Sequence, residues 1–494
     1  MALGTIPDDI RVPLTAIEID NSQALDGAPA QQHKILVIGY QGASATTPAL
    51  TQNRITSDSS AEALYGRGSM LAEMLKALRK GNTYTETWAL GIAEPGDQSG
   101  AAATSELTVT GKATAAGTLA LLVCGESVQV GIKAEDSAAS VATSVIAAVN
   151  AKTTLPVTAA LKADTTETVT LTAKWRGQTG NDQDVRVNYY PGEQTPAGLS
   201  IATLPFTGGT GTPDLTAVVA ALGDEWFNHI ICPFNDVASL NTLRDELVNR
   251  WGALKMIEAI AYTAVRGTHA QTGTWGSTRN DFLITSIGTN LAPQPSYLWA
   301  AAYGGVAAYN LAIDPARPLQ TLALPGLLPP DKAVRWDMQE RNLHLFDGVA
   351  THNVDAGGNV CIEREITTYR VNRYGDADVS YLDITSPATL GHIRYVIKNR
   401  FTTRYPRHKL ADDDVLATLE PGQPVMTPKL CTQELLDIFI TELEPAGLVE
   451  DFDDYKATLQ VTRDTADKNR LNFIIHPNLV NQLRVLAGLI QFKL

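Results

Sequence analysis

The sequence predicts a multidomain protein in which an α/β core is interrupted by a small β-rich α+β module and followed by a second α+β domain. Three observations predict this fold class. Apolar runs of strand length alternate with amphipathic helices over 31–104 and again over 212–385, which is typical of βαβ units. Residues 105–211 are instead rich in Ala and Thr and read as short strands around one helix. Residues 386–484 combine two helices with a hairpin, and 494 residues are enough for about three domains.

Residues 1–30 predict an extended strand joined to a linker. Over 8–19 apolar residues alternate with polar ones, and no hairpin partner follows. Pro13 has no backbone N–H for a ladder, so the strand belongs on a sheet edge. The Gly, Ala, Pro and Gln residues of 26–32 then form the connection to the next segment. The apolar residues of the strand are Ile10, Val12, Leu14, Ile17 and Ile19.

The first part of the core, residues 31–104, predicts a strand, a helix and a second strand. The run "KILVIG" is typical of a buried strand, and the second strand covers 85–92. Between them, residues 69–81 place apolar side chains at helical spacing and end at Gly81, a residue favoured just beyond a helix. The apolar residues at that spacing are Met70, Met74, Leu75 and Leu78.

The glycine-containing loop after the first strand does not match a nucleotide site. A dinucleotide fingerprint places its glycines at the helix start, where free backbone N–H groups hold the pyrophosphate. Here Gly39 and Gly42 lie far from the helix at 69–81, and the third glycine is missing. The stretch 207–214 lacks the Lys-Ser/Thr pair of a Walker loop. Both loops are therefore predicted to be connections.

The middle of the chain predicts the inserted module and then the remainder of the core. The module has one helix, at 136–150, with valines on one face. Its strands are predicted at 105–111, 118–125, 127–133, 156–161, 168–174 and 184–190. The α/β pattern resumes with a helix at 237–252, started by Asp236. The other elements predicted there are a helix at 214–222 and strands at 227–234, 255–262 and 281–288.

The final part of the chain predicts a hairpin and an apolar tail. Strands at 455–464 and 469–476 alternate and are joined by "TADK". Residues 485–494 predict one more apolar strand, although chain ends usually fray into water. The helices before the hairpin are predicted at 386–405 and 432–447.

Composition excludes several classes of protein. The net charge is −14 and no Lys/Arg run is long enough to follow a phosphate backbone, which excludes nucleic acid as the first partner to consider. The start lacks a signal peptide, and the longest near-apolar stretch, 297–309, is shorter than the ~20 residues of a membrane span. The sequence therefore predicts folding in a cytoplasm without membrane insertion. The widely spaced cysteines, expected as buried thiols, are Cys124, Cys232, Cys361 and Cys431.

Candidate sites for chemistry are few and weak. His344, His352 and Cys361 lie near one another and leave a zinc site open, but the surrounding stretch reads as a hairpin. His269 lies among several hydroxyl residues that complete no acid, base and nucleophile triplet. The acidic stretch 411–414 suits either a cation or a solvated loop. We predict no catalytic, cofactor-binding or metal-binding residue and no enzyme activity.

Six collinear stretches together resemble the Mu-type contractile phage tail sheath proteins over almost the whole chain. No single stretch is diagnostic alone. They are the start at 6–24, "KGNTYTETWALGI", the module end at 180–200, "LALPGLLPP", the segment 364–384, and the last hairpin with its tail.

The resemblance implies a structural role in the tail of a virion. Subunits of such a sheath stack as six-fold rings around a tail tube and contract to drive the tube through the host envelope for genome ejection and host cell entry. The implied partners are further copies of the chain, the tail tube protein, and the baseplate and tail terminator proteins, assembled in the host bacterial cytoplasm. The inserted module is implied to lie on the outer surface. Alternatives are the sheath of a related bacteriocin or secretion apparatus and, from another class, a nucleotide-dependent α/β enzyme.

The resemblance also implies that the ends of the chain act as arms that exchange strands between subunits. The expected donor strands are 8–19 and 485–494, and the expected acceptor is the hairpin of the domain 386–484, which is implied to face the tube. The donor residues in the tail are Leu486, Ile490, Phe492 and Leu494, and the acceptor residues are Leu459, Val461, Leu471, Phe473 and Ile475. Candidate tube-facing cations, which otherwise form a solvated face, are Arg394, Lys398 and Arg404.

Overall fold

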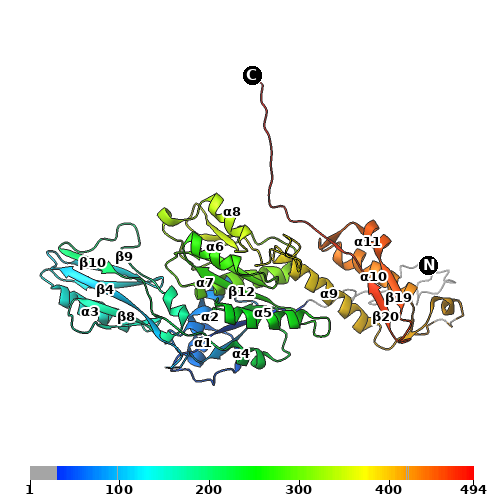
Figure 1. Ribbon diagram of the computed structural model, residues 1–494, viewed down its shortest axis with the longest axis horizontal. Helices are drawn as coiled ribbons and strands as arrows, with labels where there is room; N and C mark the ends of the chain where they lie inside the picture. The colour runs from blue at the N-terminus through cyan, green and yellow to red at the C-terminus, as the bar shows by residue number, and fades with distance from the viewer. Residues whose placement is uncertain (1–30, 97, 419, 421, 494) are drawn as a thin grey trace, which may run out of the picture. The chain divides into compact units, whose positions relative to one another are not determined.

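The computed structural model describes residues 31–493 except 97, 419 and 421 (Figure 1). The expected N-terminal strand at 8–19, with its five apolar residues, and Leu494 lie outside the described residues. The described chain divides into two compact units: a core unit of 32–391 with 482–493, and a C-terminal unit of 392–481. Each unit combines helices and strands, which confirms the predicted mixed, multidomain fold class.

A six-stranded sheet forms the centre of the core unit. Its order is β13-β12-β11-β1-β3-β2, and all neighbours are parallel except the antiparallel edge strand β2. Six of the seven residues of β1 are buried, as expected for a parallel strand covered on both faces. The strands are β1 (Lys34–Tyr40), β2 (Gln52–Ile55), β3 (Glu86–Ile92), β11 (His229–Ile231), β12 (Ile260–Arg266) and β13 (Ile284–Asn290).

Helices pack against this sheet, and two of them approach closely. The buried helix α7 contacts α2 along its length. A side chain added at Gly305 of α7 would lie 3.1 Å from the backbone oxygen of Leu78 in α2, so glycine permits this approach. The helices are α1 (Asp58–Tyr65), α2 (Met70–Gly81), α4 (Leu215–Leu222), α5 (Val237–Trp251), α6 (His269–Ser277), α7 (Ser296–Ile313) and α8 (Met338–Phe346). Within the part of the chain that the structure describes, no helix is long and apolar enough to cross a membrane.

The inserted segment forms two antiparallel sheets with their own apolar core. The sheets have the orders β10-β4-β8-β7 and β6-β5-β9, and α3 buries its valine face, including Val141 and Val145, in that core. Strand β10 was not expected from the sequence. The elements are β4 (Ala102–Gly111), β5 (Gly117–Val123), β6 (Glu126–Ile132), α3 (Ala138–Ala151), β7 (Val157–Leu161), β8 (Thr168–Arg176), β9 (Val185–Val187) and β10 (Leu199–Thr203).

Several predicted elements of the core unit differ in their bounds. The strand expected at 255–262 begins only at Ile260, and β11 is much shorter than 227–234. Helix α6 was not expected; the Thr268 side chain accepts from the Gln271 N–H and the Gln271 side chain accepts in return, a capping box that starts a helix. The hairpin expected around His352 is confirmed as β14 (Thr351–Val354) and β15 (Val360–Arg364).

The C-terminal unit begins within α9 (Thr385–Arg404) and contains two further helices and short strands. One prediction there is wrong: residues 455–458 are helical, and the first hairpin strand begins only at Gln460. The Asp451 side chain caps this helix by accepting from the Asp454 N–H. The elements are β16 (Lys409–Leu410), β17 (Val425–Met426), α10 (Pro428–Ile438) with a π-helical turn (Phe439–Leu443), β18 (Val449–Glu450), α11 (Phe452–Thr458), β19 (Gln460–Arg463), β20 (Leu471–Ile474) and β21 (Asn478–Leu479).

Candidate functional site

The hairpin β19–β20 presents apolar side chains and open strand edges. It is a two-stranded antiparallel sheet in which Val461 lies opposite Phe473. Neither strand pairs with a third strand among residues 31–493 as far as they are described, so both outer edges keep unpaired ladder positions. Phe473 and Ile474 are 42% and 54% exposed. An open edge beside exposed apolar side chains is a template for pairing with another chain.

The sequence of the connecting turn fixes the register of this hairpin. The Asp464 carboxylate accepts from the backbone N–H groups of Ala466 and Asp467, at 2.8 and 3.0 Å. Hydrogen bonds from the Asp467 N–H, the Asn472 side chain and the Ala466 N–H lower the pKa of Asp464 to about 2. The predicted acceptor residues Val461, Leu471 and Phe473 are in the hairpin strands, whereas Leu459 lies just before β19 and Ile475 just after β20.

A buried ion network connects the helices beside the hairpin. Helix α10 contacts β19. The Arg400 side chain of α9 is only 5% exposed and donates to Glu434 at 2.8 Å, to Asp437 at 2.9 Å and to Glu442 at 3.0 Å. Tyr405 donates to the other oxygen of Glu434 at 2.6 Å. One guanidinium therefore holds α9, α10 and the π-helical turn together.

The C-terminal tail is extended and exposes its apolar side chains. Residues 480–493 form no helix or strand. The predicted donor residues Leu486, Ile490 and Phe492 are 89%, 92% and 80% exposed. Contiguous exposed apolar side chains usually mark an interaction site in a soluble protein.

The candidate tube-facing cations differ in their surroundings. Lys398 is exposed, whereas Arg394 is half-buried on the same helix. Arg404 lies 3.5 Å from Glu434, so part of its charge is balanced within the unit.

The histidines of the open zinc hypothesis do not converge with the cysteine. In the β14–β15 register Asn353 lies opposite Cys361, so the neighbouring His352 projects from the other face of the hairpin. His352 Nδ1 bonds the Gly288 carbonyl at 2.9 Å, and the His344 ring stacks 4.2 Å from that of Trp336. Burial lowers the pKa of both histidines to about 4. In the described ranges no three His, Cys, Asp or Glu side chains form a metal-binding group.

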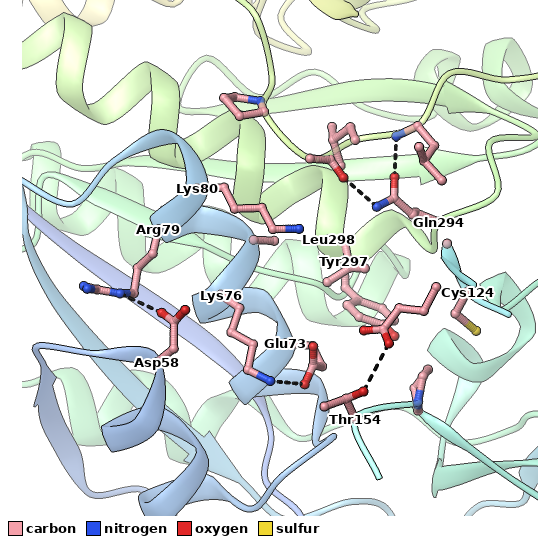
Figure 2. Close-up of a pocket in the computed structure, with 18 of the residues that line it drawn as sticks. Asp58, Glu73, Lys76, Arg79, Lys80, Cys124, Thr154, Gln294, Tyr297 and Leu298 are labelled. Carbon is pink, nitrogen blue, oxygen red and sulfur yellow. Dashed lines mark hydrogen bonds and ion pairs between the residues drawn. The ribbon is translucent and has the colours of Figure 1, made fainter. Parts of the chain in front are cut away.

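A cavity of about 600 Å³ lies beside α2 in the core unit (Figure 2). Arg79 pairs with Asp58 at 2.8 Å, and Lys76 pairs with Glu73 at 2.8 Å, so these charges balance one another at the cavity wall. Burial raises the pKa of the Cys124 thiol to about 12, which keeps it protonated and unreactive. The cavity is lined by residues of both the inserted module, such as Glu126, and the core, such as Glu73.

Gly39 in β1 and Gly42 in the loop that follows both permit close packing. A side chain added at Gly39 would lie 3.3 Å from Leu71 Cα, and one at Gly42 would lie 3.4 Å from Tyr65 O. Gly39 therefore lets the end of β1 lie against the start of α2, and Gly42 lets the loop lie against the end of α1.

Comparison with known proteins decides the family. The sequence models of the phage tail sheath β-sandwich, central and C-terminal domains match residues 98–212, 208–368 and 376–493. The Mu-like prophage FluMu tail sheath protein of Haemophilus influenzae is 45% identical over 494 residues, and the match covers all of both chains. The chain belongs to the phage tail sheath proteins. This confirms the predicted resemblance, and the chain is a structural subunit of a tail sheath.

Solved structures of other sheath proteins are more distant. The sheath tail protein of Desulfitobacterium hafniense is 12% identical, with 95% of this sheath chain and 100% of that chain covered and a TM-score of 0.46. The contracted helical sheath of the anti-feeding prophage is 11% identical, with 98% and 99% covered and a TM-score of 0.47.

One functional group was missed from the sequence. Arg484, at the root of the sheath tail, pairs with Glu365 and Asp383 of the core unit. The available signal is a lone arginine within the otherwise apolar stretch 483–490.

Proposed function

We propose that this sheath subunit polymerises as stacked six-fold rings around a tail tube and contracts to drive the tube through the host envelope. The observation that carries the proposal is that one chain has both an exposed apolar tail and a hairpin with open strand edges. The chain acts without catalysis, as part of the virion tail, and is assembled in the host cytoplasm. Its partners are further copies of itself, the tail tube protein, and the baseplate and tail terminator proteins.

Strand donation between subunits explains how these two features act together. The tail 485–494 of one subunit adds to the open edge of β19–β20 in a neighbour, which satisfies backbone groups on both chains. Leu486, Ile490 and Phe492 then pack against Val461 and Phe473. A donor and an acceptor on different surfaces give a heterologous contact, which propagates as a ring or a helix. The strand at 8–19 acts as a second donor.

The proposed arrangement assigns a place to each part of the chain. Residues 386–484 face the tube, and the module at 105–211 lies on the outer surface. The core of 31–104 and 212–385 lies between them, and the arms are 1–30 and 485–494. Arms that stay bonded while the bodies rotate allow the lattice to contract without losing its connectivity.

Polymerisation of the purified chain tests the proposal, and three alanine variants test the absence of chemistry. We expect tubes by negative-stain microscopy from the wild type and from His269→Ala, His352→Ala and Asp413→Ala. His352→Ala removes a buried ring and is expected to cost about 2 kcal/mol of stability without loss of assembly. Particles that never exceed a single subunit would contradict the sheath proposal. Loss of tubes in a folded variant would revive a metal or catalytic site.

Charge reversal on α9 tests the face toward the tube. Arg394→Glu with Lys398→Glu is expected to give sheaths that polymerise without enclosing tube, because many weak, salt-sensitive contacts hold an acidic tube. Co-expression with the tube protein and microscopy measure tube content. Lys112→Glu with Lys133→Glu, an equal charge change on the inserted module, serves as the control. Normal tube-filled particles from the α9 variant would refute the assignment.

A further inference from the structure

The root of the C-terminal tail, residues 482–484, is fastened to the core unit by alternate side chains. Gln482 Nε2 donates to the Ala316 carbonyl at 3.0 Å and also to the Thr385 hydroxyl. Arg484 donates to Glu365 at 2.5 Å and to Asp383 at 2.9 Å. Leu483 between them is 70% exposed, as expected for an extended segment with one face against protein.

The carboxylate that receives Arg484 is fully buried. Glu365 is 0% exposed, and its Oε1 also accepts from the Leu319 N–H at 3.1 Å. Arg364 donates two hydrogen bonds of 3.0 Å to Asp383 and so balances the charge of that carboxylate. The cation paired with Glu365 is Arg484. A buried carboxylate that loses its cation keeps an uncompensated charge, which is costly. This cost stabilises the state in which Arg484 is paired with Glu365.

The contacts that hold the root of the tail end at Arg484. Val485 is 81% exposed, and in the part of the tail that the structure describes the hydrogen bonds to the rest of the core unit end at Arg484. On the other side, the Val480 N–H donates to Leu448 O beside the pair β18–β21. Gln482 has its own hydrogen bonds to Ala316 and Thr385, so the Arg484 pairs hold residues 483 and 484 in place.

We propose that Arg484 is the positioning residue that fixes the working length of the donor arm and transfers tension from it into the α/β core. This inference rests on the proposed strand donation. With the root fastened, the ten residues 485–494 span at most about 35 Å. When the Arg484 pairs are broken, the free span lengthens by residues 483–484, because Gln482 keeps its own hydrogen bonds. A longer tether lowers the effective concentration of the arm at its acceptor and loosens the link between bodies.

Tryptic cleavage of the full-length subunit tests whether Arg484 is held. Glu365→Gln keeps an acceptor for the Leu319 N–H but removes the charge, and Glu365→Gln with Asp383→Asn is the stronger variant. We expect cleavage after Arg484 to accelerate roughly tenfold or more, because the bond then samples open conformations freely. Cleavage after the exposed Lys468 is the internal control and should not change. Unchanged cleavage after Arg484 in both variants would overturn the proposal.

The rate at which assembled tubes contract or disassemble tests whether the Arg484 pairs transfer tension from the arm to the core. Glu365→Gln tubes are expected to form, since the arm is intact, but to contract or disassemble in urea roughly tenfold faster than wild-type tubes. Equal rates would overturn the role of Arg484 while leaving strand donation in place. Deletion of 485–494 in the same assay separates the two ideas, because normal tubes from the deletion would instead refute the arm itself.

Discussion

Deletion of residues 485–494 is expected to give a folded subunit that no longer forms tubes. The large apolar side chains removed from the described tail, Leu486, Ile490 and Phe492 among them, are each at least 80% exposed. Their loss removes almost no packing, so the free energy of unfolding should change by less than about 0.5 kcal/mol. Negative-stain microscopy measures tube formation, and urea unfolding measures stability.

Two double substitutions distinguish strand donation from non-specific hydrophobic association of the tail. Leu486→Ser with Ile490→Ser changes the face predicted to enter the acceptor, whereas Val485→Ser with Leu489→Ser changes the opposite face of an extended strand. Both remove similar exposed apolar area, but only the first should abolish tubes. Equal effects of the two pairs, or tubes of normal length and stability from the deletion, would contradict the donor-strand assignment.

Arg400→Met is expected to unfold the C-terminal unit selectively. The substitution leaves the side chains of Glu434 and Glu442, only 11% and 12% exposed, without their cation, which costs about 3–5 kcal/mol. All seven tryptophans lie between 88 and 336, so tryptophan fluorescence reports the core unit, whereas far-UV circular dichroism reports both units. We expect an early urea transition by circular dichroism and an unchanged fluorescence midpoint.

Arg463→Met is the matched control for this prediction. Arg463 pairs with Asp412, which is 67% exposed, and an ion pair at the surface contributes at most about 1 kcal/mol. Its circular dichroism transition should stay close to that of the wild type. If Arg400→Met and Arg463→Met shift the circular dichroism transition by similar amounts, burial does not determine how much the Arg400 ion pairs stabilise the unit.

Local patterns were sufficient to predict the elements that bury one clear face. Helix α2 was predicted from its apolar spacing, and α5 from its spacing with Asp236 as the cap. Apolar alternation gave the wrong element where a single capping residue starts a helix. Asp451 caps the helix α11, although the residues from 455 onward alternate as in a strand. Helix α6, which begins at a Thr268 capping box, was missed for the same reason.

The tail could be predicted from sequence more readily than its attachment. The alternation of Leu486, Ile490 and Phe492 is visible in the chain itself. The partner of Arg484 is not, because Glu365 lies far away in sequence and only the folded core brings a buried carboxylate to the root. Long-range ion pairs of this kind depend on tertiary structure, which periodicity does not report.

A cryo-EM map of assembled particles tests the central claim most directly. The proposal predicts stacked rings in which residues 485–494 of one subunit form a strand against the β19–β20 hairpin of another, with Arg484 still paired to Glu365 of its own subunit. A map in which residues 485–494 fold back onto their own subunit, with no strand added to β19–β20, would contradict it.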